Sequence, residues 1–389
     1  MPVNNDLTLK VGGYEVAGWK EIRVTRSMEI FPSDFELIAA EGIPNTVVSS
    51  LVEGAPCEIS VAGKTLLVGK IDAVDEKLTI NDHGVAVRGR SKCRELFDCS
   101  AEIASWHGTR NSTTITELAV ELCQPYGIRV DDLTSRYPGG QTSNPRFEQF
   151  TANLGETPYS ILERVARSVG VLVYDDPEGN LVLARFLGEP HSLRGSLVLG
   201  KNIEAITVRR SVDQRYHHYR VIPQSVNSFE DRRHEANQAG GARTNFIQAA
   251  SIDPGVDPMR GLYIIGEQAL LSRNLAQQRA DWDRNRRWGR SQPISTTVDS
   301  WFDSQGRLWQ PNTLVEVKAP KLIATNREWT LATVTFNKGA GGTTADLVLM
   351  PPQAFDIQPS VLQPTYADRT QAAREAADAA RQDPRGGGQ

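Results

Sequence analysis

Hydrophobic and polar residues alternate in short runs over residues 7 to 90. Leu7, Leu9 and Val11 alternate with polar neighbours, and the pair Gly12-Gly13 then supplies a turn. The same period of two recurs in residues 22–25, 35–37, 57–61, 66–71 and 85–88, and Ala62-Gly63-Lys64 predicts a hairpin turn between the third and fourth of these runs. Short strands separated by turn residues predict a small barrel or sandwich rather than a parallel sheet.

The period changes to that of helices between residues 99 and 186. Thr114 and Glu117 form a capping-box pattern in front of an apolar stripe, and Pro125 and Gly127 end that helix. A second helix is predicted from Pro158 to residue 169, followed by a hairpin over residues 171–185. This segment predicts an α+β domain.

Strand-like alternation returns at residues 202–221 and again at 293–351. Between them, residues 224–260 are polar and predict a long loop, and residues 263–288 predict a long helix that packs on the middle domain. The chain beyond residue 359 is rich in Ala, Arg, Asp and Gln and predicts a flexible tail. The predicted plan is mainly β with α+β: β-barrel-like domains at 1–98 and 187–358, a middle domain at 99–186, and a tail at 359–389.

Composition excludes several classes of protein. The net charge of -4 over 389 residues is not that of a general nucleic-acid binder, and four cysteines are too few for a disulfide framework. The first residues carry no basic and apolar signal segment, and no apolar run is long enough to span a membrane. These features predict a soluble multidomain protein with reduced thiols, made in a cytoplasm.

The stretch VRGRSKCRELFDCSA, residues 87–101, links the predicted first strands to the helical segment through a connector without periodicity. Loops at such corners must satisfy their own backbone groups, so an inter-domain corner is favoured over a catalytic role. The residues predicted to hold this junction together are Arg90, Ser91, Lys92, Asp98 and Cys99.

Two motifs that suggest chemistry fail on inspection. Gly63-Lys64-Thr65 invites a phosphate-loop interpretation, but Glu58 stands where that motif requires glycine, and a strand follows instead of a helix. Adjacent carboxylates at residues 131–132 and 175–176 cannot face each other across a substrate and lie beside turn residues, which predicts solvated turns. No catalytic or metal-ligating set is predicted.

His217 and His218 fall in a strand-like segment, which predicts that their rings point to opposite faces and share no metal. Trp301, Trp309 and Trp329 allow a carbohydrate-binding interpretation, but core packing is favoured in strand and turn contexts.

The end of the predicted long helix is basic, with interleaved aspartates. A cationic C-terminus is favourable for any helix, so a solvated helix end accounts for much of this pattern. The alternative is contact with another subunit or partner. The candidate contact residues are Arg279, Trp282, Arg286 and Arg287.

Ordered pieces of the chain resemble the Mu-type phage tail baseplate hub proteins. The matching pieces are LTLKVGG at 7–13, GW at 18–19, VTRS at 24–27, FEL at 35–37, GAPCEI at 54–59, GKIDAVD at 69–75, GRSK at 89–92, DCSA at 98–101, LA at 118–119, PYGI at 125–128, RADW at 279–282, NRR at 285–287, GRLWQPN at 306–312 and LVLMPPQAF at 347–355. Each piece is ordinary turn or strand chemistry, but their number and order are specific.

This resemblance implies a structural role and no cofactor. Such proteins are similar in plan to the T4-type hub and to the base of type VI secretion spike proteins, in which three copies form a ring. Each copy contributes two similar barrels, so six near-equivalent units meet a hexameric tail tube while the other face holds a trimeric spike. No repeat is visible at the residue level between the two β regions, and no fused spike or lysozyme domain is expected.

The implied partners are the tube protein, the central spike protein, baseplate wedge or tape-measure proteins, and DNA that passes without specific binding. The implied location is the virion tail, assembled in the bacterial cytoplasm. Two alternatives stay open: a cell-wall hydrolase of the tail tip, and the hub of a contractile particle without a genome.

Overall fold

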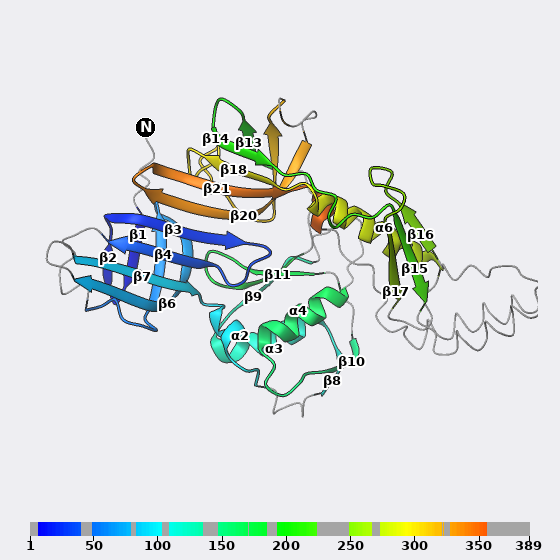
Figure 1. Ribbon diagram of the computed structural model, residues 1–389. Coiled ribbons are helices and arrows are strands. Elements are labelled where there is room, and N and C mark those ends of the chain that lie inside the picture. The colour runs from blue at the N-terminus through cyan, green and yellow to red at the C-terminus, as the bar shows by residue number, and fades with distance from the viewer. Residues whose placement is uncertain are drawn as a thin grey trace, which may run out of the picture.

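The protein is mainly β, and thirteen of its described strands share one curled half-barrel sheet. The computed structural model describes residues 7–39, 49–78, 83–102, 109–134, 147–169, 171–184, 193–223, 249–266, 273–320, 322 and 327–355. Helices and smaller sheets pack below and beside the large sheet (Figure 1). The predicted mainly β class is confirmed, whereas the predicted layout of two barrel-like domains around an α+β domain, and the domain limits, stay predictions.

The N-terminal lobe contains the strands predicted from the alternating pattern. They are β1 (Leu7–Val11), β2 (Tyr14–Val16), β3 (Trp19–Ser27), β4 (Asp34–Ala39), β5 (Pro56–Val61), β6 (Lys64–Leu78) and β7 (His83–Ser91). The predicted turn between β5 and β6 is present, with Ala62 and Gly63 at φ values of 48° and 73°. Positive φ values at both residues give the turn a twist that matches the right-handed twist of the two flanking strands.

The middle domain combines three helices with two small sheets. Its elements are α2 (Arg94–Asp98), β8 (Thr109–Thr113), α3 (Ile115–Cys123), η2 (Gln124–Tyr126), β9 (Val130–Asp132), β10 (Phe147–Thr151), α4 (Pro158–Val169), β11 (Leu172–Asp175) and β12 (Leu181–Ala184). The capping box predicted at Thr114 and Glu117 is confirmed, with both reciprocal hydrogen bonds present. Residues 94–98, predicted as an irregular connector, instead form α2, which buries Leu96.

The C-terminal lobe completes the large sheet. Its strands are β13 (Leu193–Val198), β14 (Ile203–Val208), β18 (Ile294–Val298), β19 (Thr313–Lys318), β20 (Arg327–Gly339) and β21 (Gly342–Met350), and the short helix η5 (Pro352–Phe355) follows. Trp301, Trp309 and Trp329 are all buried in its core, as predicted.

A distal lobe projects from the C-terminal lobe (Figure 1). It consists of β15 (His218–Pro223), β16 (Ala249–Ile252), β17 (Gly261–Gly266) and α6 (Arg273–Arg290). The prediction of a helix over 263–288 was wrong at its start, because residues 261–266 pair in parallel with β15. The prediction of a loop over 224–260 was wrong for 249–252, which form β16, while residues 224–248 and the tail lie outside the described residues.

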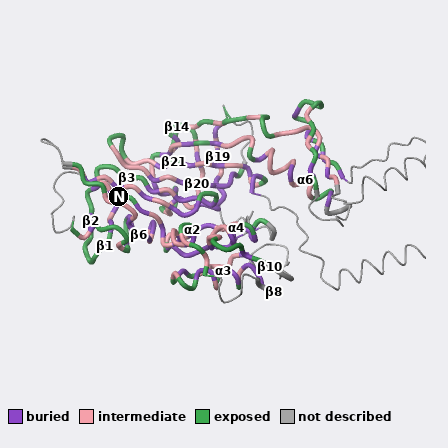
Figure 2. Tube along the Cα trace, turned by 60° about the horizontal axis from the view of Figure 1, so that its bottom comes forward, coloured by how far each residue is buried: buried purple, intermediate pink, exposed green. Residues whose placement is uncertain are grey.

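The two β lobes are joined edge to edge rather than as separate sheets. Strand β3 pairs antiparallel with β20, from Ser27 opposite Thr333 to Ile22 opposite Lys338. One continuous hydrophobic core lies under strands of both lobes. Buried positions of the trace gather along this large sheet (Figure 2).

The two lobes repeat the same arrangement of five strands. Across the sheet, the N-terminal lobe runs β3-β4-β7-β6-β5 and the C-terminal lobe runs β14-β18-β21-β20-β19. When the five strands of each lobe are numbered along the chain, their order across the sheet is first, second, fifth, fourth and third in both lobes. The lobes differ beyond these five strands, because β1 pairs antiparallel with β5 whereas β13 pairs in parallel with β19.

Irregularities of the strands repeat at matching positions. The ladder between the fourth and fifth strands shifts register directly after Ile71 in one lobe and directly after Leu331 in the other. The ladder between the first and second strands shifts directly after Trp19 and directly after Ile203. These bulges align the two lobes residue by residue, although their side chains differ.

Candidate functional site

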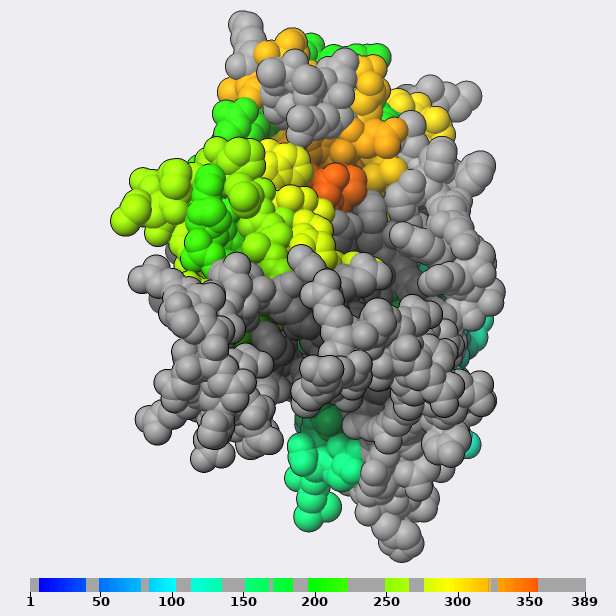
Figure 3. Space-filling view, turned by 90° about the vertical axis from the view of Figure 1, so that its right-hand side faces the viewer, coloured from blue at the N-terminus to red at the C-terminus, as the bar shows by residue number. Residues whose placement is uncertain are grey.

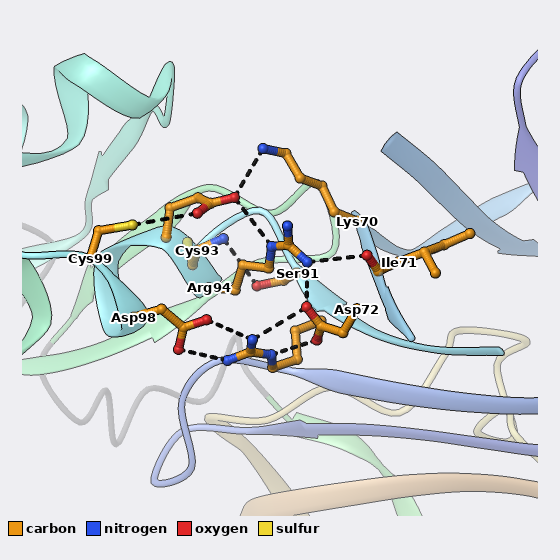
Figure 4. A network of polar contacts seen from close by, with 10 residues as sticks. Lys70, Ile71, Asp72, Ser91, Cys93, Arg94, Asp98 and Cys99 are labelled. Atoms are coloured by element: carbon orange, nitrogen blue, oxygen red, sulfur yellow. Dashed lines mark hydrogen bonds and ion pairs between the residues drawn. The ribbon is translucent and has the colours of Figure 1, made fainter. Parts of the chain in front are cut away.

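The predicted junction is a network of charged side chains between β6, β7 and α2 (Figure 4). Arg90 donates to Asp72, at 2.6 Å from Nε to Oδ2, and to Asp98, at 2.6 Å from Nη2 to Oδ2. Arg94 also donates to Asp72 and, at 3.2 Å, to the carbonyl oxygen of Ile71. Two arginines thus clamp the first helix of the middle domain onto the end of the N-terminal lobe.

A second cluster of the junction surrounds Glu95. Lys70 donates to Glu95 Oε1 at 3.0 Å, Arg94 Nε donates to the same oxygen at 3.2 Å, and the thiol of Cys99 donates to Oε2 at 3.6 Å. Burial raises the pKa of Glu95, but the hydrogen bonds and charges of Lys70 and Arg94 outweigh it, so the pKa lies below its ordinary value. Cys99, predicted as a junction residue, lies here and is partly exposed.

The deepest polar contact of the junction is the carboxylate of Asp175, which is 2% exposed. It accepts the backbone N–H of Ser33 at 3.1 Å and the hydroxyl of Ser33 at 2.8 Å. Burial raises the pKa of Asp175, and hydrogen bonds from Ser91 and Ser33 oppose that shift. The prediction of a solvated turn was wrong for this residue, because its hairpin inserts between the lobes.

The guanidinium of Arg26 lies near this carboxylate and is also buried. Burial lowers the pKa of Arg26, while the negative charge of Asp175 raises it. No motif identified this pair, because the two residues lie far apart in the sequence and Arg26 sits in an ordinary strand pattern.

The turn after Asp175 fits against the N-terminal lobe through its backbone. Val68 donates its N–H to the carbonyl of Pro177 at 2.8 Å, and Lys92 donates its N–H to the carbonyl of Val68 at 3.2 Å. A Cβ at Gly179 would lie 2.6 Å from the Val68 oxygen, so this turn requires glycine. Lys92 thus contacts the lobe through its backbone, and Ser91 donates its N–H to the carbonyl of Ser33 at 2.9 Å. The junction role of both residues stays a prediction.

The pair His217-His218 and the carboxylate of Asp132 are arranged differently from the sequence-based predictions. The rings of His217 and His218 were predicted on opposite faces, but they touch edge to face with centroids 4.5 Å apart, because His217 precedes the strand. Asp132 lies in strand β9, not in a turn, and accepts the hydroxyl of Thr134 at 2.6 Å. The described residues contain no group of three side chains able to hold a metal ion.

The basic end of α6 is held largely by contacts within the chain. Arg279 donates to Asp283 at 3.0 Å, and Arg287 lies 3.7 Å from the same carboxylate. The guanidinium groups of Arg279 and Arg286 lie 5.1 and 5.4 Å from the centroid of the Trp282 ring. The helix lies against β15, β16 and η5 (Figure 3).

A groove of about 540 Å³ separates α6 from the middle domain. Trp282 and Arg286 line one wall, and Tyr159 and Glu163 of α4 line the other. Arg290 at the end of α6 pairs with Glu29 of the N-terminal lobe. Of the four predicted contact residues, Trp282 and Arg286 therefore line this groove.

The large sheet carries a polar hollow of about 630 Å³ that spans both lobes. Arg23 pairs with Asp34 at 2.7 Å and with Glu36 at 3.5 Å. Arg88 pairs with Glu36 at 3.0 Å and with Asp75 at 2.6 Å. Each of these arginines is thus neutralised by two carboxylates on the same face.

Three models of known protein families match successive segments of the chain. Residues 6–91 match the model for the N-terminal domain of Mu phage baseplate assembly protein GpP-like proteins. Residues 93–185 match the second domain of baseplate hub protein gp44-like proteins, and residues 272–358 match the fourth domain of Mu phage baseplate assembly protein GpP.

Individual relatives span nearly the whole chain. The baseplate hub protein gp44 of Escherichia phage Mu is 29% identical over 342 residues, covering 86% of this chain and 84% of that protein. The 43 kDa tail protein of prophage MuSo2 from Shewanella oneidensis is 27% identical, with a TM-score of 0.73 over 92% of this chain and all of that one.

A more distant likeness concerns the fold alone. The E. coli c3393 protein, a component of the type VI secretion system, is 14% identical with a TM-score of 0.52, over 92% of this chain and 80% of that one. That protein is described as structurally similar to the T4 tail proteins gp27 and gp5.

Proposed function

The chain belongs to the Mu-type phage baseplate hub proteins, and on that premise we propose that three copies form a ring that adapts the hexameric tail tube to the trimeric central spike. It is a structural component of the tail baseplate and not an enzyme. The described residues contain no helix that is long and apolar enough to cross a membrane.

The repeat of five strands is the observation that carries this proposal. A threefold assembly meets a sixfold tube without mismatch only where each copy presents two similar units. The shared strand order and the matching bulges after Ile71 and Leu331 supply two such units in each copy.

The polar hollow supports the proposal of a channel for DNA. It spans the join between the two lobes, so the same face of three copies would form a continuous polar wall. On this face Arg23 and Arg88 are each paired with two carboxylates, which leaves their charge compensated. Such a wall lets a polyanion pass without binding it strongly.

The proposed partners are the tube protein, the spike protein and baseplate wedge or tape-measure proteins, in a virion assembled in the bacterial cytoplasm. Trp282, Arg279, Arg286 and Arg287 are proposed to face such partners or neighbouring subunits. The contacts of Arg279 and Arg287 with Asp283 orient this surface.

Native mass measurement of the purified chain tests the ring. We expect a particle of three times the chain mass of 42.8 kDa at micromolar concentration. A species that stays monomeric throughout the micromolar range, or a dimer, would contradict the proposal.

A further inference from the structure

Among the edges of the large sheet that have no partner in the described residues are those of β14 and of the second half of β6. Strand β14 pairs with β18 on one side only. Beyond it, Arg209 and Ser211 donate their backbone N–H groups to Pro293 and Ser291 on that same side. Strand β6 pairs with β5 only up to Lys70, so its residues 73–78 pair with β7 alone.

These two edges are the counterparts of the edges that join the lobes inside one chain. In the repeat, β14 corresponds to β3, and residues 73–78 of β6 correspond to residues 333–338 of β20. The strand of each lobe that pairs across the join thus has an unpaired equivalent in the other lobe.

We propose that β14 and residues 209–211 of one copy pair antiparallel with residues 73–78 of β6 in a second copy, in the register of the β3–β20 ladder. The aligned bulges set this register. Ser27 opposite Thr333 within the chain corresponds to Ser211 of one copy opposite Ala73 of the second copy. Residues 206–210 then pair with residues 74–78 in the same register. This inference rests on the proposed trimer and names the surfaces that form it.

Exposure differs at matching positions of the two lobes. Met28 is 3% exposed, whereas its equivalent Val212 is 46% exposed. Likewise Arg26 is buried and its equivalent Arg210 is exposed. In the N-terminal lobe the middle domain contributes to this burial, because Met28 packs in one cluster with Tyr174 and Val182 as well as with Ala332 of β20. The pairing therefore rests on the strand repeat and not on burial.

Charge at the two edges is complementary in this register. Asp75 falls directly opposite Arg209, at the place where Thr25 and Thr335 meet within the chain with their hydroxyl oxygens 3.4 Å apart. Glu76 falls diagonal to Arg210, within reach of a long side chain. Two acidic residues of β6 thus meet two basic residues beyond β14.

The current partners of Arg209 and Asp75 leave these two side chains available. The Arg209 side chain is 72% exposed, and its guanidinium lies 3.9 Å from the carboxylate of Asp213. Asp75 is 56% exposed and pairs with Arg88 at 2.6 Å, a contact that a second arginine can share.

The pairing is heterologous, since one edge of a copy meets a different edge of the next. Such contacts close into a ring when the rotation from unit to unit divides a full turn. Because the proposed join between copies repeats the join within a copy, three chains give six similar joins.

Disulfide formation tests the register directly. Asp75 and Arg209 would form a pair without direct hydrogen bonds, whose Cα atoms are about 4.5 Å apart, which suits a disulfide. We expect Asp75→Cys/Arg209→Cys to give covalently linked trimers under mild oxidation and no longer polymers. Asp75→Cys/Arg210→Cys, which places the second thiol on the opposite face, is the matched control and should give none.

Charge reversal tests the same contact without cysteine. We expect Asp75→Arg to raise the concentration at which trimers dissociate by on the order of tenfold, and Asp75→Arg/Arg209→Asp to restore it. A stable trimer without the cross-link and without sensitivity to these changes would overturn the edge pairing but leave the trimer intact. A wild-type monomer would overturn both.

Discussion

Ser33 donates both its backbone N–H and its hydroxyl to the carboxylate of Asp175, a residue 142 positions further along the chain. This contact ties the hairpin of the middle domain to the N-terminal lobe at a site with almost no exposure to water. This buried carboxylate is therefore one of the contacts that fix the position of the middle domain relative to the large sheet.

Replacing Asp175 with alanine should strongly destabilise the protein. The change leaves the two donors of Ser33 and the charge of Arg26 buried without their acceptor, so we expect a loss of about 3 kcal/mol in the free energy of unfolding, measured by urea titration. Asp131→Ala is the control. Among the residues that the structure describes, Asp131 pairs only with the exposed Arg129, so this change should cost about 0.5 kcal/mol or less. Equal losses would contradict this role.

The junction should weaken in acid. Hydrogen bonds from Arg90 hold the pKa of Asp98 below its ordinary value of 3.8. A carboxyl group whose pKa is lower in the folded state stabilises the fold above its unfolded pKa, and this contribution is lost as the pH falls through the folded pKa. As the pH decreases below 4, we expect the urea midpoint of the wild type to fall by more than that of Asp98→Asn, because the variant lacks the carboxyl group that becomes protonated. Parallel pH profiles would show that the ion pair contributes nothing.

One of the four thiols should react in the folded protein. Burial raises the pKa of Cys57 and of Cys123 to about 12, and it also raises that of Cys93. Cys99 is partly exposed, and its pKa is raised by partial burial and by the charge of Glu95. We expect an aromatic disulfide reagent at pH 8 to titrate one thiol before unfolding and four after it.

The Glu95→Gln variant refines that measurement. Removing the negative charge beside Cys99 lowers its thiol pKa, so labelling should become faster in this variant. Two or more thiols reacting at similar rates in the folded wild type would contradict the burial of the other three.

Gly289 in α6 should not tolerate alanine. Alanine in place of glycine inside a helix ordinarily stabilises it by about 0.5–1 kcal/mol. Here the added Cβ would lie 2.4 Å from the backbone nitrogen of Ala354, so η5 must move off the helix. We expect a lower melting temperature for Gly289→Ala, with Gly339→Ala, whose Cβ would meet nothing within 4 Å, as the control. A rise in melting temperature for Gly289→Ala would contradict this packing.

Local patterns sufficed for elements whose signals are contained in a few residues. The capping box at Thr114, the turn at Ala62 and Gly63, and the burial of Trp301 were all predicted, because each depends on near neighbours or on simple hydrophobicity. The junction was predicted from the same kind of signal, since several charged residues cluster in the stretch 87–101. Their partners Lys70 and Asp72 lie outside that stretch.

Features that depend on distant parts of the chain could not be predicted this way. Asp175 sits in an ordinary turn sequence, and only the lobes that close around it make it a buried acceptor. The strand at 261–266 exists because β15 provides a partner.

The repeat of the two lobes was also invisible in the sequence, because it is conserved in backbone pairing and not in side chains. Gly54 and Asn312 show this: they are different residues, yet both have positive φ, 80° and 59°. Each donates its N–H to the carbonyl of the matching residue, Ile71 or Leu331.

Electron microscopy of the purified chain, viewed along the symmetry axis, tests the central claim most directly. The account predicts threefold particles with a central hole and a wall of six similar β lobes, in which β14 of each copy lies beside β6 of the next. Particles with no hole, or with three lobes lining the hole and three placed elsewhere, would contradict it.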